Sequence, residues 1–247
     1  MDLYQEAKEI IIKAGEQVLE RNGIEEIKEK GKADYVTAVD FQVQQLIFKK
    51  LLELDDSIQF LGEEKDNEEI DFHKNIWILD PVDGTTNLIH DFQHSVISLA
   101  YYEQGKVQFG IVYNPFSKEL FEAKLGEGAY RNGEKIKVSQ NENLSECLIG
   151  MGTAPTYRQN ADTNFKRMRN VYDGCQDIRR IGSAALELCY VACGRLDGFF
   201  EENLKIWDYA AGKLLVQEAG GQVEILENKV IASNPAIMEA FKKIVME

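Results

Sequence analysis

The amino-acid sequence predicts a layered α/β protein in which helices pack against β-sheets. Two observations carry this prediction. Segments with helical and strand-like apolar spacing alternate along most of the 247 residues, and a run of short strands without intervening helices occupies residues 95–131. Alternating elements build sheets covered by helices, whereas consecutive strands joined by turns build an antiparallel meander. The chain shows no internal repeat and no low-complexity linker.

The composition is that of a soluble globular protein with a substantial core, at 44% hydrophobic and 28% charged residues. The formal charge of -14 disfavours direct binding to nucleic acid or to an anionic membrane, since both require concentrated Lys and Arg. The four cysteines form no CxxC pair, and no apolar run approaches the length of a membrane span. We therefore expect a cytoplasmic protein with free thiols and no secretory leader.

The N-terminal part contains two amphipathic helices. Apolar residues recur at helical spacing in residues 2–22, and Gly23 is a suitable stop signal. The polar stretch 30–34 is interpreted as a loop, and residues 35–39 as partly β-favouring. Asp40 precedes the second helical pattern, so its position alone favours an N-cap. A short strand follows at residues 58–61.

The central stretch combines a buried strand with two carboxylates. Residues 76–79 are bulky and β-favouring, and Pro81, which lacks an N–H group, is expected to end the strand at Asp80. From Gly84 onward the chain can open a short helix, whose first N–H groups attract phosphate. Asp80 and Asp83 would repel that phosphate unless a divalent cation bound both. The stretch is therefore interpreted as a metal-assisted phosphate site rather than an Asp/Pro/Gly turn.

The second half begins after a polar stretch at residues 138–143, which we take as the boundary between subdomains 1–140 and 141–247. Strands are expected at 147–150, 177–180, 199–201, 223–225 and 230–232. Helices are expected at 164–172, from Ser183 to a stop at Gly194, over 207–218 and at the C-terminus. Ser183 is a favourable N-cap.

Four acidic residues are candidates for one cluster: Glu63, Asp80, Asp83 and Asp208. Packed together, their carboxylates would raise one another's pKa values, so the cluster requires cations. Oxygen-only ligation favours Mg²⁺ or Mn²⁺ over zinc. Paired metals polarise a phosphoryl oxygen and activate water. The cluster therefore indicates phosphomonoester hydrolysis by in-line attack of water.

The chain resembles the inositol monophosphatase family of lithium-sensitive, Mg-dependent phosphatases. The resemblance rests on three motifs in the order and spacing of that family: Gly62-Glu63-Glu64, the run from Trp77 to Asn87, and Trp207-Asp208-Tyr209-Ala210-Ala211-Gly212. Residues 34–40, 182–185 and 217–221 support it, so that the matches span nearly the whole chain. The resemblance implies a layered α-β-α-β-α sandwich, usually dimeric, in which subdomain 1–140 carries most metal ligands and subdomain 141–247 completes the site.

The same resemblance implies a role for each motif residue. One Mg²⁺ falls to Glu63, Asp80 and the Val82 carbonyl, a second to Asp80, Asp83 and Asp208, and Glu63 can share a third. Thr85, paired with Asp40, would deprotonate the attacking water, which displaces the N-cap interpretation; the catalytic set is thus Thr85, Asp40 and Glu63. Substrate contacts are expected from Asp83, Gly84, Thr85, Gly182, Ser183, Ala184, Glu201 and Asp208.

Inositol monophosphate is the first substrate choice, because Glu201 favours a polyol ring. The same mechanism acting on fructose 1,6-bisphosphate, a nucleotide 3′-phosphate, histidinol phosphate or NADP remains open. A haloacid dehalogenase-type phosphatase is disfavoured, because its aspartates lie two apart rather than three. A regulatory or scaffold protein that retains the fold is the alternative from another class. No role is assigned to Glu64 or to the three histidines.

Overall fold

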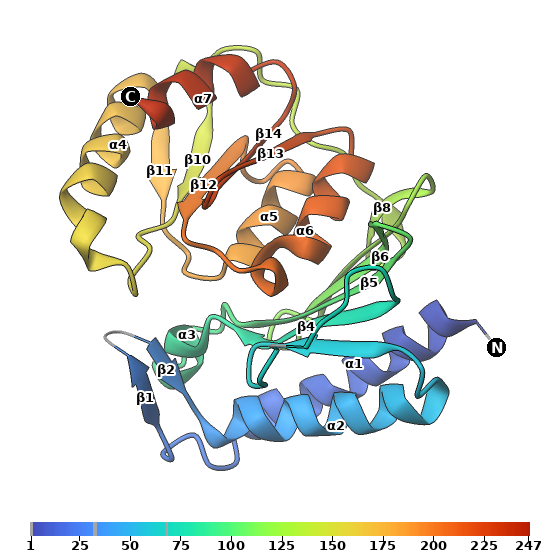
Figure 1. Ribbon diagram of the computed structural model, residues 1–247. Helices are drawn as coiled ribbons and strands as arrows, with labels where there is room; N and C mark the ends of the chain where they lie inside the picture. The colour runs from blue at the N-terminus through green and yellow to red at the C-terminus, as the bar shows by residue number, and fades with distance from the viewer. Residues whose placement is uncertain (1, 32–33, 68) are drawn as a thin grey trace.

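The computed structural model describes residues 2–31, 34–67 and 69–247. Two sheets lie between three helical layers, in the order α-β-α-β-α (Figure 1). This confirms the layered fold. No helix within these described ranges has the length and apolarity needed to cross a membrane, and all four cysteines are free thiols.

The larger sheet has seven strands in the order β3-β4-β5-β6-β7-β8-β9. β3 and β4 are parallel, and every later pair is antiparallel, as the predicted meander requires. The strands are β3 (Gln59–Gly62), β4 (Ile76–Asp83), β5 (Val96–Glu103), β6 (Lys106–Asn114), β7 (Glu119–Lys124), β8 (Gly128–Arg131) and β9 (Glu134–Lys135).

The smaller sheet has five strands in the order β11-β10-β12-β14-β13. β10 lies parallel to both β11 and β12, and β14 pairs antiparallel with β12 and β13. These strands are β10 (Leu148–Met151), β11 (Asp177–Arg179), β12 (Gly198–Glu202), β13 (Gln222–Leu226) and β14 (Lys229–Ser233). The two sheets thus divide the chain between residues 135 and 148; the exact subdomain boundary at 140/141 stays a prediction.

Three hydrophobic cores separate the layers. Helices α1 (Leu3–Glu20) and α2 (Ala38–Leu54) pack on the outer face of the larger sheet. Helices α5 (Ala184–Ala192) and α6 (Ile206–Glu218) lie between the two sheets and share one continuous core with both. Helices α4 (Ala161–Gly174) and α7 (Met238–Met246) cover the far face of the smaller sheet. A functional site between the halves can therefore draw on both sheets.

Three local expectations are wrong. Residues 30, 31 and 34 belong not to a loop but to a hairpin of β1 (Lys28–Gly31) and β2 (Asp34–Val36), while residues 32–33 of that stretch lie outside the described residues. The N-cap of α2 is Thr37, not Asp40. Asp40 instead lies three residues later and accepts the Thr37 N–H at 2.9 Å, which completes a capping box.

The third correction concerns β4, which continues past Pro81 to Asp83. Its register with β5 shifts between Asp80 and Asp83, so that two residues of β4 oppose one of β5. This is a β-bulge, the position where a strand tolerates a proline, because the missing N–H is not needed for the ladder. The bulge determines where the two aspartates point.

Candidate active site

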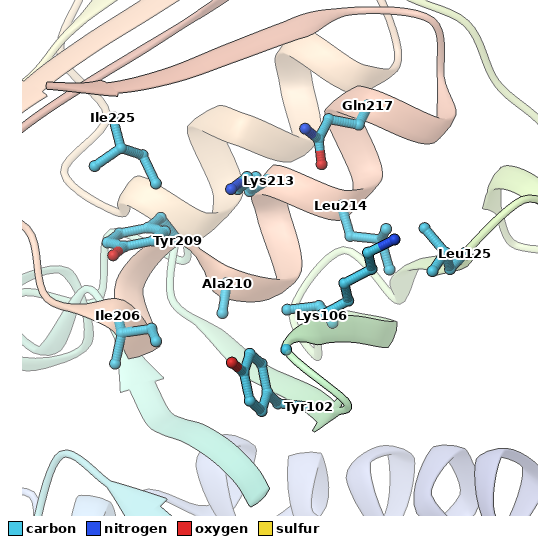
Figure 2. Close-up of a pocket in the computed structure, with 12 residues that line it drawn as sticks. Tyr102, Lys106, Leu125, Ile206, Tyr209, Ala210, Lys213, Leu214, Gln217 and Ile225 are labelled. Carbon is cyan, nitrogen blue, oxygen red and sulfur yellow. The ribbon is translucent and has the colours of Figure 1, made fainter. Parts of the chain in front are cut away.

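An acidic pocket of about 190 Å³ lies between the larger sheet and the ends of α5 and β12. Both halves of the chain contribute to its lining: Glu63, Asp80, Val82, Asp83, Gly84, Thr85, Pro155, Thr156, Arg180, Gly182, Ala184, Glu201, Leu204 and Asp208. A larger pocket of about 440 Å³ lies between α6 and the turn that joins β5 to β6 (Figure 2). Its lining is mainly apolar and includes no carboxylate. The acidic pocket is therefore the candidate active site.

The bulge in β4 brings Asp80 and Asp83 to the same pocket. Residues three apart in a regular strand point to opposite faces. Ile78 packs on the α5/α6 side of the sheet, whereas Leu79 packs on the α1/α2 side. Val82 also packs on the α1/α2 side, which reverses the alternation and leaves Asp83 on the same side as Asp80. The extra residue thus places both carboxylates in one pocket.

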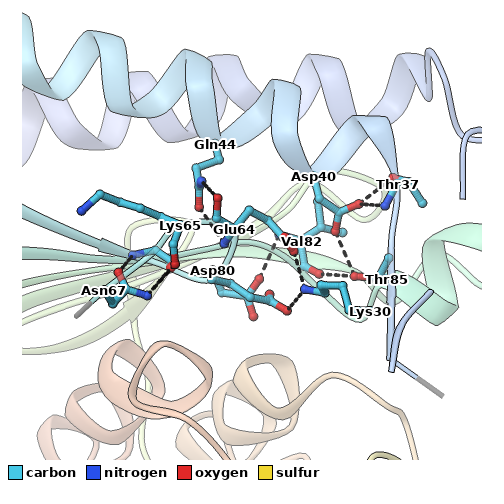
Figure 3. A network of polar contacts seen from close by, with 12 residues as sticks. Lys30, Thr37, Asp40, Gln44, Glu64, Lys65, Asn67, Asp80, Val82 and Thr85 are labelled. Atoms are coloured by element: carbon cyan, nitrogen blue, oxygen red, sulfur yellow. Dashed lines mark hydrogen bonds and ion pairs between the residues drawn. The ribbon is translucent and has the colours of Figure 1, made fainter. Parts of the chain in front are cut away.

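Glu63 directly follows β3, beside the parallel strand β4 that carries Asp80. Burial, followed by repulsion from Glu63, raises the pKa of Asp80 well above its usual range. Lys30, on the β1–β2 hairpin, lies 3.0 Å from Glu63 Oε1 and 2.7 Å from Glu64 Oε1 (Figure 3). A lysine cation therefore partly neutralises this end of the pocket.

Thr85 is held from behind by Asp40, a fully buried residue of α2 (Figure 3). The Thr85 hydroxyl lies 2.9 Å from Asp40 Oδ1 and 3.2 Å from the carbonyl oxygen of Val82. The other Asp40 oxygen accepts the N–H and hydroxyl of Thr37. Burial raises the pKa of Asp40, and the hydrogen bonds from Thr37 and Thr85 oppose that rise. The hydroxyl of Thr85 is thus oriented by an acceptor outside the pocket.

Asp83 connects the two halves of the chain. Its Oδ2 accepts the hydroxyl of Ser183 at 2.7 Å and the N–H of Ala185 at 2.6 Å, at the first turn of α5. Ser183 is the N-cap of that helix, as predicted. Burial raises the pKa of Asp83 to about 6, against the lowering effect of these hydrogen bonds and of Arg180. The carboxylate is therefore fixed toward the second half before any ligand binds.

The remaining acids come from the second half. Glu201, 7% exposed on β12, accepts the N–H of Ala154 at 3.1 Å, and burial raises its pKa to about 7. Asp208 lies in the first turn of α6 and accepts the N–H of Lys205 at 2.6 Å. Burial, followed by repulsion from Asp83, raises the pKa of Asp208 well above its usual range.

The charge of the pocket calls for cations. Glu63, Asp80, Asp83, Glu201 and Asp208 line it together with one basic residue, Arg180. Burial and then repulsion from Glu63, Asp83 and Asp208 raise the pKa of Asp80 well above its usual range. A divalent cation would remove this repulsion, and the oxygen-only donors suit Mg²⁺.

The carboxylates do not yet converge on one point: within the described residues, no three Asp, Glu, His or Cys side chains have the spacing of a metal site. Lys30, Ser183, Ala185 and Lys205 instead occupy carboxylate oxygens. Each of these contacts uses one oxygen of its carboxylate, so ligation requires side-chain rotations that bring the carboxylate oxygens together.

Most of the residues predicted for the site meet in this pocket. Asp40 and Ser183 do not line it, because they lie behind Thr85 and Asp83 respectively. The sequence interpretation missed Lys30 and Arg180. Lys30 stands in an alternating run of charged residues typical of a surface segment, and Arg180 was only the last residue of the strand expected at 177–180. Neither pattern indicates which carboxylate the cation would face.

Comparison with known proteins gives a consistent assignment. Residues 1–245 match the model of the inositol monophosphatase family. The chain is 38% identical over 224 residues to an inositol-1-monophosphatase of Rhizobium meliloti, covering 87% of this chain and 84% of the relative. It is 37% identical over 223 residues to Nus factor SuhB of Escherichia coli K12, with the same coverage.

Solved structures support the same relationship. The extragenic suppressor protein suhB from Bartonella henselae superposes with a TM-score of 0.93 at 35% identity, over 100% of this chain and 99% of that chain. The match therefore includes both sheets and all three helical layers. This chain belongs to the inositol monophosphatase family.

Proposed function

We propose that this protein is a Mg²⁺-dependent phosphomonoesterase that hydrolyses inositol monophosphate by in-line attack of water. Family membership supports a phosphatase. The observation that carries the proposal is the Thr85–Asp40 pair, which borders the same pocket as four candidate metal-binding carboxylates. A candidate proton acceptor, four candidate cation ligands and the Gly84 turn thus surround one pocket, which supports the proposal.

The cations would be held by residues that already line the pocket. One Mg²⁺ would bind Glu63, Asp80 and the carbonyl oxygen of Val82, and another would bind Asp80, Asp83 and Asp208, with Glu63 available to a third. When bound, Mg²⁺ polarises the phosphoryl oxygens and lowers the pKa of water. Mn²⁺ offers similar oxygen ligation. Arg180 and the ion-paired Lys30 do not supply enough positive charge to neutralise the carboxylates without a metal.

Thr85 and Asp40 would position the attacking water and receive its proton. When the Thr85 hydroxyl donates to Asp40, the nearer of its two acceptors, an oxygen lone pair is available to a water in the pocket. A proton taken by Thr85 can pass to Asp40, whose pKa is raised by burial. Glu63, which also lines the pocket, is assigned to the same catalytic set. The pair therefore acts on the nucleophile rather than on the leaving group.

The phosphate would bind the turn at Gly84. Gly84 is the N-cap of α3 (Thr85–Ile89), and its φ of 94° lies in the left-handed region. A Cβ atom there would lie 3.0 Å from the carbonyl oxygen of His94 and 3.3 Å from that of Gly182, so glycine is needed both for the backbone and for space. The first-turn N–H groups of Gly84 and Thr85 supply the donors for the phosphate.

The alcohol part of the substrate would face the second half of the chain. Glu201 keeps one oxygen for a sugar hydroxyl, because Ala154 uses the other. Asp83, Asp208 and the turn of Gly182, Ser183 and Ala184 complete the contacts, with Ser183 acting through its backbone because its hydroxyl is given to Asp83. Several hydrogen-bonding groups around one opening suit a polyol ring.

A regulatory role is the second candidate function. It is favoured by the relatives named Nus factor SuhB, which match over most of this chain. Such a role would use the fold as a binding surface for transcription factors and would not need turnover. A pull-down enriched in polymerase factors, and unchanged by Asp83→Asn, would support it. Lithium inhibition, homodimer formation and a cytoplasmic location remain predictions of the family resemblance.

The deciding experiment is phosphate release with and without Mg²⁺ from inositol 1-phosphate, fructose 1,6-bisphosphate, adenosine 3′,5′-bisphosphate, histidinol phosphate and NADP. The proposal expects strong Mg²⁺-dependent release, greatest for inositol 1-phosphate. A preference for another ester would keep the mechanism and replace the substrate. Absence of release from every ester, in a folded and Mg²⁺-loaded protein, would favour the regulatory role.

A further inference from the structure

The mouth of the acidic pocket carries one basic side chain that the proposed chemistry does not use. Arg180 follows β11 and precedes the turn that starts α5. Among the described residues that line the pocket it is the only cation, beside five carboxylates. Its side chain is exposed, so its charge is available to a ligand that enters the pocket.

The position of Arg180 is fixed by the opposite rim. Its Nε and Nη2 donate to the hydroxyl of Thr153 at 3.3 and 3.1 Å. Thr153 belongs to a loop anchored by Glu201, which accepts the next N–H, that of Ala154. Within the described part of the chain, Nη1 of Arg180 donates to no acceptor. One edge of the guanidinium is thus held by Thr153, while Nη1 packs against Gly182 and keeps its N–H donors for a ligand.

The charge of Arg180 reaches the interior of the pocket. It lowers the pKa of Asp83, Glu187 and Glu201, partly offsetting the larger rise that burial causes in each. The neighbouring Arg179 differs: its guanidinium donates to Asp177 and to the carbonyl of Ile178, and it does not line the pocket. The two adjacent arginines therefore form a natural pair for comparison.

We propose that Arg180 and Thr153 form a subsite for a second anionic group of the substrate. The ligand class is a phosphate monoester whose alcohol part carries another phosphate or a carboxylate. A guanidinium binds a phosphate or carboxylate through two parallel N–H donors. An uncharged hydroxyl forms a weaker hydrogen bond with the same guanidinium. The subsite rests on the proposed phosphatase function and deepens it, since it ranks bisphosphates above monophosphates with the same alcohol.

The test compares a matched substrate pair, fructose 1,6-bisphosphate and fructose 1-phosphate, in the Mg²⁺-loaded full-length protein. Arg180→Gln is expected to lower kcat/KM for the bisphosphate by about 10- to 100-fold, the range of a charge-assisted hydrogen bond. The loss for the monophosphate is expected to be several times smaller. Arg180→Lys should show an intermediate loss of kcat/KM for the bisphosphate, because lysine keeps the positive charge but lacks the planar pair of N–H donors. Arg179→Gln is the control and should alter neither substrate.

Two results would overturn the subsite. An equal loss for both substrates would make Arg180 a positioning or charge-balancing residue, and no loss for either would show that it faces only solvent. Failure of the wild-type protein to release phosphate from any ester would contradict the proposed function instead. In that case calorimetric binding of the same pair to wild type and Arg180→Gln still decides the subsite, since only an anion site distinguishes the two compounds.

Discussion

The two halves of the pocket are built in different ways. The first half presents Glu63, Asp80 and Asp83 at the ends of adjacent strands, with Thr85 fixed by the buried Asp40. The second half presents turns, helix starts and an exposed arginine, together with one strand residue, Glu201 of β12. Strand ends backed by buried hydrogen bonds hold atoms in place, whereas loops and helix starts can vary without disturbing a sheet. The contrast suggests that the first half determines the chemistry and the second half determines the substrate.

The strongest test of this division is Asp83→Asn, because Asp83 belongs to the first half but is bound to the second. We expect kcat/KM to fall by at least about 100-fold, since even indirect partners of a metal contribute 10–100-fold. The asparagine oxygen can still accept from Ser183 and Ala185, so the fold should persist by circular dichroism. Asp197→Asn is the matched control: Asp197 also accepts a backbone N–H, that of Leu148 at 2.7 Å, but lies outside the pocket. Near-normal activity of Asp83→Asn would exclude Asp83 as a metal ligand.

Thr85→Ala addresses the first half alone. Loss of the hydroxyl removes the proposed acceptor of the water proton, so kcat should fall by about 100-fold or more while KM changes little. The adjacent Thr86→Ala provides the control, because Thr86 is exposed and does not line the pocket. Steady-state kinetics with inositol 1-phosphate would measure both parameters. A change confined to KM would reassign Thr85 to substrate binding and weaken the contrast between the halves.

The pH dependence of folding stability tests one acidic residue of the pocket from each half, Asp83 and Glu201. Burial raises the folded-state pKa of Asp83 to about 6 and that of Glu201 to about 7. An acid with a raised pKa stabilises the folded state while protonated, so this contribution is complete below the unfolded value near 4 and is lost as pH rises through about 6 and 7.

Thermal denaturation of the metal-free protein should therefore show Tm falling by several degrees between about pH 5 and pH 8. Mg²⁺ binds the ionised carboxylates, so its stabilising effect should be larger at the higher pH. If the Mg²⁺-induced rise in Tm were the same at both values, the pocket acids would not be the binding groups.

The smallest expected effect concerns Lys30, which contacts Glu63 and Glu64 from the β1–β2 hairpin. Its ion pairs with Glu63 and Glu64 are partly exposed, and such pairs contribute up to about 1 kcal/mol. Lys30→Gln should therefore lower the Mg²⁺ concentration for half-maximal activity by about 2- to 5-fold. Lys28→Gln, on the same strand, is the control. An unchanged or weaker Mg²⁺ requirement would show that Lys30 does not compete with the metal.

Much of this architecture could be predicted because it depends on local patterns. Apolar periodicity located nearly all helices and strands, and Ser183 was recognisable as an N-cap. The four metal-binding candidates followed from carboxylates placed after strands or at a helix start, and the family motifs supplied their partners. Local sequence patterns therefore predict the position of each element and the class of chemistry.

Other features depend on contacts between distant residues. Pro81 is typical of a strand end, yet β4 continues past it through a bulge whose presence depends on the pairing with β5. Asp40 occupies a position where an N-cap is favourable, but Thr37, three residues earlier, is the N-cap, and Asp40 accepts from Thr85. Lys30 and Arg180 meet the pocket only through tertiary packing. These are relations between elements, which the spacing of residues within one element does not encode.

The hydrogen bonds that join Asp83 to the start of α5 have a consequence for how such proteins can evolve. One oxygen of Asp83 accepts hydrogen bonds from Ser183 and Ala185 and so connects the larger sheet to the second half. We therefore expect this position to matter for assembly of the halves as well as for the proposed catalysis. A descendant that had lost catalysis would still need a hydrogen-bond acceptor at this position, which asparagine could also supply. A conserved acceptor at position 83 is therefore weak evidence of an active enzyme, whereas replacement of Thr85, whose hydroxyl is proposed to position the attacking water, would be an early sign that catalysis has been lost.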